Sequence, residues 1–199
     1  MVLGAIHIAF WIWPFNGLAQ AEGARQFLGV IGAIFGFGTM IYTGILLAAA
    51  RPIAFWSTGM LPLLFLVSAL STGMMAVILL ALLGGTANER TIHTLARIDI
   101  AIIVLEMFVL AFFLQATHRV PESRASARLV MFGYAAPLFW LGVAILGLIA
   151  PLVFDMLDML VLASICGIVG GLFLRQVILT GGIHAPLRAG RFEIGLPIV

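Results

Sequence analysis

Long apolar stretches, divided by short polar links, dominate the pattern of hydrophobic and polar positions along this chain. Each stretch is close to the roughly 20 residues that a helix needs to cross the hydrocarbon core of a bilayer. The pattern predicts six membrane spans, at residues 2–19, 25–50, 60–84, 92–117, 128–151 and 154–178. The links are short, so neighbouring spans are expected to run antiparallel. We therefore predict an all-α integral membrane protein that forms a single domain, a bundle of about six transmembrane helices.

The composition supports the same class. Of the 199 residues, 63% are hydrophobic and only 9% are charged, whereas a soluble domain averages about 25% charged residues. The net charge is only +2, and the arginines are scattered over several links, so no nucleic-acid-binding patch is expected. We therefore predict that this protein lies in a lipid bilayer.

The arginines also predict an orientation. Most of them fall on the side of the membrane where the N-terminus lies: Arg51, Arg119, Arg124, Arg128, Arg188 and Arg191. Arg25 and Arg90 fall on the opposite side. Cytoplasmic links carry the excess of positive residues in membrane proteins, so both termini are expected in the cytoplasm.

The fourth span contains three ionisable side chains that lipid should not surround. Arg97 and Asp99 come one to two turns after its start, and Glu106 follows Asp99 by seven residues. Seven residues are almost two helical turns, so the two carboxyls share one face, about 10 Å apart along the axis. Such groups are expected to face the bundle interior or water. Two interpretations stay open: helix pairing through a salt bridge or hydrogen bonds, or a proton relay.

Other polar groups extend this line. Asp155 and Asp158 are predicted to begin the sixth span, where a spacing of three places them on one face. Arg175 lies near the opposite end of that span. We interpret the serines and threonines of the third span, Ser68, Ser71 and Thr72, as neutral, because these residues often bond to their own helix backbone.

Tyr42 lies well inside the second span, away from the interfacial belt where membrane tyrosines gather. Its hydroxyl needs a partner there. A glutamate or a ligand carbonyl would serve.

Haem and metal are not expected in this protein. A bis-histidine haem needs two inward-facing histidines at matched depth, but His93 lies on one side of the membrane and the other histidines, His7, His118 and His184, on the other. The sequence also has no phosphate-binding loop, dinucleotide fingerprint, CxxC or HExxH motif.

Three stretches resemble one known family. They are IYTGILLAAARPIAFWSTGMLPLLFLVSALSTG at residues 41–73, RIDIAIIVLEMF at residues 97–108 and LRQVILTGG at residues 174–182. In the first, a YTG helix end leads through a link with a proline and a tryptophan into a further helix. The protein resembles the NrfD/PsrC family over about residues 25–187. Members of that family are quinone-binding integral subunits of polysulfide-reductase-type and related molybdopterin oxidoreductase complexes.

The resemblance implies a function and partners. The protein would be the quinone-interacting membrane anchor of a respiratory oxidoreductase in a bacterial or archaeal cytoplasmic membrane. It would pass electrons between menaquinone or ubiquinone and an iron–sulfur subunit, which contacts a molybdopterin catalytic subunit. Family members have eight or more spans, so their first helices are expected to be missing here or supplied by another polypeptide.

The resemblance also implies roles for residues. Tyr42 matches the tyrosine of the family's quinone-bearing bundle, and a headgroup near the outer side would lie close to His93, Arg97 and Asp99. Positions that match proposed proton-path or helix-pairing positions are Arg51, Asp99, Glu106 and Arg175, and Asp155 and Asp158 extend that path. Two other functions remain open: a proton- or ion-conducting transporter subunit without a redox role, and a purely structural anchor.

Overall fold

The computed structural model describes residues 22–49, 53–85, 88–182, 187–189 and 192–194. The helices are α2 (Glu22–Ala48), α3 (Met60–Gly84), α4 (Glu89–Arg119), α5 (Pro121–Phe132), the π-helix η2 (Leu138–Ile149), α6 (Ala150–Met156) and α7 (Leu160–Thr180). Two three-residue strands, β1 (Leu187–Ala189) and β2 (Phe192–Ile194), pair antiparallel with Leu187 opposite Ile194. Apart from this hairpin the described elements are helical, and the prediction of an all-α membrane protein is confirmed.

Within the described ranges, five helical stretches are long and apolar enough to cross a bilayer: Gln26–Ala48, Met60–Gly84, Glu89–Arg119, Leu138–Met156 and Leu160–Thr180. The protein is therefore a multi-pass membrane protein. The first predicted span, residues 2–19, lies outside the described residues.

The last two spans begin and end later than the sequence pattern predicts. The link after α4 is itself helical, because Pro121 suits the first turn of α5 and the helix continues to Phe132. The next span starts at Leu138 and continues through the π-helix η2 into α6, which ends at Met156. The backbone then turns at residues 157–159, whereas the aspartates had predicted a helix start near residue 154.

Local signals fix the two ends of the link between α3 and α4. Gly85 ends α3 in the left-handed conformation, with φ of 59°, which glycine adopts without a steric penalty. Asn88 precedes α4, and its side-chain oxygen accepts a hydrogen bond from the Arg90 N–H at 3.2 Å. This bond satisfies one of the free N–H groups at the start of α4.

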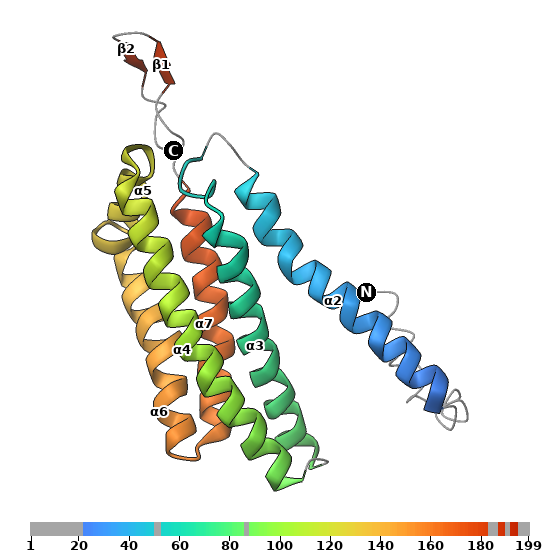
Figure 1. Ribbon diagram of the computed structural model, residues 1–199. Coiled ribbons are helices and arrows are strands. Elements are labelled where there is room, and N and C mark those ends of the chain that lie inside the picture. The colour runs from blue at the N-terminus through green and yellow to red at the C-terminus, as the bar shows by residue number, and fades with distance from the viewer. Residues whose placement is uncertain (1–21, 50–52, 86–87, 183–186, 190–191, 195–199) are drawn as a thin grey trace. The chain divides into compact units, whose positions relative to one another are not determined.

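The protein divides into two compact units, residues 1–42 and 43–199. In the second unit, α7 packs against α3 on one side and against η2 and α6 on another, and α3 also packs against α4. Figure 1 shows these helices running alongside one another. Glycine lets two of them approach backbone to backbone: a Cβ atom on Gly170 of α7 would lie 1.9 Å from the Cα of Gly147 in η2. This is how membrane helices without bulky side chains at their interface achieve close contact.

Candidate functional site

The inward face of α4 carries two carboxyls. The buried residues of α4 repeat every three or four positions, and Asp99 and Glu106 stand in this stripe together with Ile92, Ile103 and Phe113. Asp99 is 1% exposed and Glu106 is 6% exposed. The prediction that both carboxyls face the bundle interior is confirmed by their burial. Their functional roles remain predictions.

Asp99 is only half satisfied by hydrogen bonds. The Ser71 hydroxyl of α3 donates to one of its oxygens, Oδ1, at 3.1 Å. The other oxygen, Oδ2, is buried and has no hydrogen-bond partner. Buried carboxyl oxygens are normally paired, because leaving one unpaired costs roughly 1–3 kcal/mol. An unpaired buried oxygen marks Asp99 as a group that is available to a proton or a water molecule.

A small cavity adjoins Glu106. Its volume is about 10 Å³, close to the minimum that a single water molecule needs. The cavity is lined by Ser71, Thr72 and Glu106, by the glycines Gly147, Gly167, Gly170 and Gly171, and by Val143, Leu148 and Leu174.

Arg175 of α7 lies at the edge of this group. It is close enough to Glu106 to attract a carboxylate there, while one of its guanidinium nitrogens donates to the Gly171 carbonyl at 3.3 Å. The one ion pair within 4 Å in the described part of the protein lies elsewhere. Arg175 therefore does not hold Glu106 in a direct ion pair.

A third buried carboxyl comes from another helix. Asp155 lies in α6 and is 8% exposed, and its Oδ2 is also buried without a hydrogen-bond partner. Its helix packs against α4, which carries Asp99. We refer to Asp155 of α6 and to Asp99 and Glu106 of α4 together as the row of buried carboxyls.

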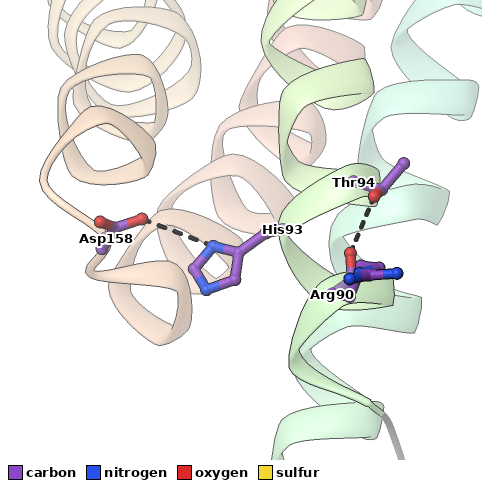
Figure 2. Close-up of polar contacts among 4 residues, drawn as sticks. All are labelled: Arg90, His93, Thr94 and Asp158. Atoms are coloured by element: carbon purple, nitrogen blue, oxygen red, sulfur yellow. Dashed lines mark hydrogen bonds and ion pairs between the residues drawn. The ribbon is translucent and has the colours of Figure 1, made fainter.

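The predicted pairing of Asp155 with Asp158 on one helix face is wrong. Asp155 belongs to α6, whereas Asp158 lies in the turn after it, with a positive φ of 57° that non-glycine residues seldom adopt. Asp158 is exposed and forms an ion pair with His93, whose Nδ1 lies 3.6 Å from its Oδ1 (Figure 2). On the other side of His93 in Figure 2, the Thr94 hydroxyl donates to the Arg90 carbonyl one turn back at 2.8 Å.

The remaining predicted residues are not members of the row of buried carboxyls. Arg97 is exposed, because two positions along a helix turn it about 200° away from Asp99. Tyr42 belongs to the first unit and is 60% exposed. Arg51 lies outside the described residues. The structure thus gathers Asp99, Glu106, Asp155 and Arg175, and leaves His93, Arg97 and Asp158 on the surface.

The neutral interpretation is right for Thr72 and wrong for Ser71. Thr72 donates to the Ser68 carbonyl of its own helix at 2.8 Å, as predicted. Ser71 donates to Asp99 instead, and the buried Ser68 hydroxyl faces Glu106 without reaching hydrogen-bond geometry. A signal was available in the sequence. Ser68 and Ser71 are spaced by three, and they continue the stripe of buried apolar positions along α3.

Comparison of the sequence with known protein families shows which family this protein belongs to. The family model described as "Polysulphide reductase, NrfD" matches residues 8–186, which is most of the sequence. The protein belongs to the NrfD family. This confirms the resemblance found in the sequence.

Curated relatives carry the same family names. The C subunit of polysulfide reductase from Wolinella succinogenes is 32% identical to this NrfD-family protein over 150 residues, which are 71% of this sequence and 47% of that protein. The NrfD homolog of Haemophilus influenzae is 28% identical over 167 residues, which are 78% of this sequence and 51% of that protein. The sequence thus spans about half the length of these relatives. No solved structure gave a significant match.

Proposed function

We propose that this NrfD-family protein is the quinone- or quinol-interacting membrane subunit of a respiratory oxidoreductase complex. It exchanges electrons between menaquinone or ubiquinone and an iron–sulfur subunit, which serves a molybdopterin catalytic subunit. Family membership supports the general role, and one relative is named as a subunit of polysulfide reductase. Two observations carry the proposal: Asp99 and Asp155 each have a buried carboxyl oxygen without a partner, and a water-sized cavity lies beside Glu106.

A purely structural role accounts less well for these carboxyls. Groups kept for helix pairing are expected to have both oxygens bonded, because half-satisfied polar networks in a low dielectric are costly. Here Asp99 and Asp155 each leave a buried oxygen without a partner. The alternative, a proton- or ion-conducting transporter subunit without a redox role, predicts no co-purification with an iron–sulfur or molybdopterin subunit.

The proposed chemistry is proton exchange. Oxidation of a quinol releases two protons and two electrons, and the electrons leave through the iron–sulfur subunit. In this proposal Asp99 accepts a proton at Oδ2, the oxygen that Ser71 does not occupy. Glu106 carries a proton deeper into the bundle, through the water-sized cavity and toward Arg175. Asp155 joins the row beside Asp99.

The cavity is too small for a quinone ring, so the headgroup would lie outside it. We place the headgroup toward the Asp99 end of α4, on the side where His93 and Arg97 are exposed. Tyr42 remains a proposed quinone-binding residue, and Arg51 and Asp158 remain members of the proposed proton path. The partner subunits would dock on this same side, which the arginine distribution assigns to the outer face.

The test compares two glutamates on the same helix. Glu106→Gln should lower quinol-coupled turnover of the assembled complex about 100-fold, because a positioned acid–base group contributes about that much. The matched control is Glu89→Gln, which changes an exposed carboxyl in the first turn of α4 and should leave turnover unchanged. Complex assembly is checked by co-purification. Normal turnover of an assembled Glu106→Gln complex would leave only the structural role.

A further inference from the structure

A second, much larger hollow lies where α4 ends and α5 packs back against it. It is open to the surroundings and has a volume of about 620 Å³. Its walls are mainly apolar, formed by Ala111 and Leu114 of α4 and by Met131 and Phe132 of α5. Gln115, His118 and Arg119 add polar groups. None of these residues belongs to the row of buried carboxyls.

The polar groups are not mixed with the apolar ones along α4. The α4 residues of the hollow are spaced by three and four, so they share one helix face. Ala111 and Leu114 come first, and His118 and Arg119 occupy the last turn, so that Arg119 lies about 12 Å beyond Ala111 along the axis. The hollow is therefore apolar at its membrane-buried end and cationic where the span leaves the membrane.

The cationic end is reinforced by α5. Arg124 is exposed, and its Nε donates to the His118 carbonyl at 3.1 Å, which holds α5 against the end of α4. Arg128 is exposed one turn later. Between residues 118 and 132 the sequence contains three arginines and one acid, Glu122. A phosphate is the group that such an arginine cluster binds best, because guanidinium groups donate two hydrogen bonds side by side.

We propose that this hollow binds one anionic phospholipid, with its phosphate at Arg119 and His118 and an acyl chain along Leu114, Met131 and Phe132. The order of the groups matches the order within the lipid: charged headgroup at the membrane surface and hydrocarbon below it. Basic pockets between transmembrane helices are known to hold anionic headgroups in this way. The occupant would fix the angle between α4 and α5 without taking part in proton transfer.

Trp140 offers a probe next to the hollow. Its indole N–H donates to the Met131 carbonyl at 3.1 Å, so its ring adjoins the wall of the hollow. The complete protein, with its partner subunits, is placed in nanodiscs of phosphatidylcholine that contain a small fraction of brominated phosphatidylglycerol. Bromine quenches tryptophan fluorescence on contact, and Trp140→Phe identifies the share of the signal that comes from Trp140. Quenching by brominated phosphatidylglycerol should exceed quenching by brominated phosphatidylcholine at equal fraction.

Two arginines at opposite ends of α4 provide the comparison. Arg119→Gln should reduce the preference for the anionic lipid about fivefold, the contribution of one arginine near a charged headgroup. Arg90→Gln, which changes an exposed arginine in the first turn of the same helix, should leave the preference unchanged. Equal quenching by both lipids, or an undiminished preference in Arg119→Gln, would overturn the proposal. Displacement of the brominated lipid by added menaquinone or ubiquinone would also overturn it, in favour of a quinone occupant.

Discussion

Two hollows border α4, and they differ in nearly every physical property. The one at Glu106 has about 10 Å³ and is lined by hydroxyls, a carboxyl, glycines and three aliphatic side chains. The one at Arg119 has about 620 Å³ and is mainly apolar. One helix thus borders two different environments. Inside the bundle α4 carries polar groups beside a space that fits only a proton or a water molecule. On the outside it presents an apolar surface large enough for a lipid. The first environment depends on close helix contact, and the second on arginines at the end of a span.

The largest effect is expected from filling the close contact beside the small cavity. In Gly170→Ala the new Cβ would lie 1.9 Å from the Gly147 Cα and 2.7 Å from its nitrogen, so the backbone of η2 or α7 must move. Overpacking of this kind costs about 1–3 kcal/mol, and backbone contact favours the upper end. The thermal unfolding midpoint of the purified protein should fall, and turnover should fall with it.

Gly73→Ala in α3 is the matched control for this change. No atom lies within 4 Å of a Cβ at that position. The variant should unfold at the wild-type midpoint or slightly above it, because alanine favours helix over glycine. Equal unfolding midpoints for Gly170→Ala and Gly73→Ala would show that close packing beside the cavity does not determine stability.

A smaller effect is expected from the hydrogen bond that orients Asp99. Ser71→Ala leaves both carboxyl oxygens of Asp99 without a partner, which should lower the free energy of unfolding by about 1–3 kcal/mol. The same serine substitution in an Asp99→Leu background should cost almost nothing, because the acceptor is gone. Additive losses in this double-mutant cycle would show that the Ser71–Asp99 bond contributes no coupling.

The smallest effect on stability is expected outside both hollows. Asp158→Asn removes the exposed ion pair with His93 and keeps a residue type that tolerates positive φ. Exposed pairs contribute about 0.2–1 kcal/mol, so the unfolding midpoint should barely move. His93→Gln should be equally stable, and any loss of its turnover would then report on the proposed quinone contact. Unchanged turnover in His93→Gln would remove His93 from the quinone-binding residues.

The sequence predicted the inward face of α4 because the information is local. A spacing of seven places Asp99 and Glu106 on one face of any helix, and the cost of exposing them to lipid turns that face inward. Arg97 illustrates where such reasoning stops. It was grouped with Asp99 by proximity in sequence, but the helix turns it to the opposite side.

Other features depend on which helices meet, and spacing within one span cannot reveal that. The hydrogen bond from Ser71 to Asp99 depends on the packing of α3 against α4, which the sequence of α3 alone does not reveal. Asp155 was predicted to begin the sixth span, but it lies buried near the end of α6, which packs against α4. The large hollow exists because residues 121–132 form a separate helix, whereas the sequence pattern predicted a link up to residue 127 and a span from residue 128.

The central claim is that the buried carboxyls of α4 exchange protons with the quinone pool. Infrared difference spectroscopy of the assembled complex, recorded between its oxidised and quinol-reduced states, observes carboxyl groups directly. We predict carboxyl bands that change on reduction in the wild type. The band of Glu106 should disappear in Glu106→Gln and persist in Glu89→Gln. A difference spectrum without any carboxyl band, or with the same band in Glu106→Gln, would contradict the central claim.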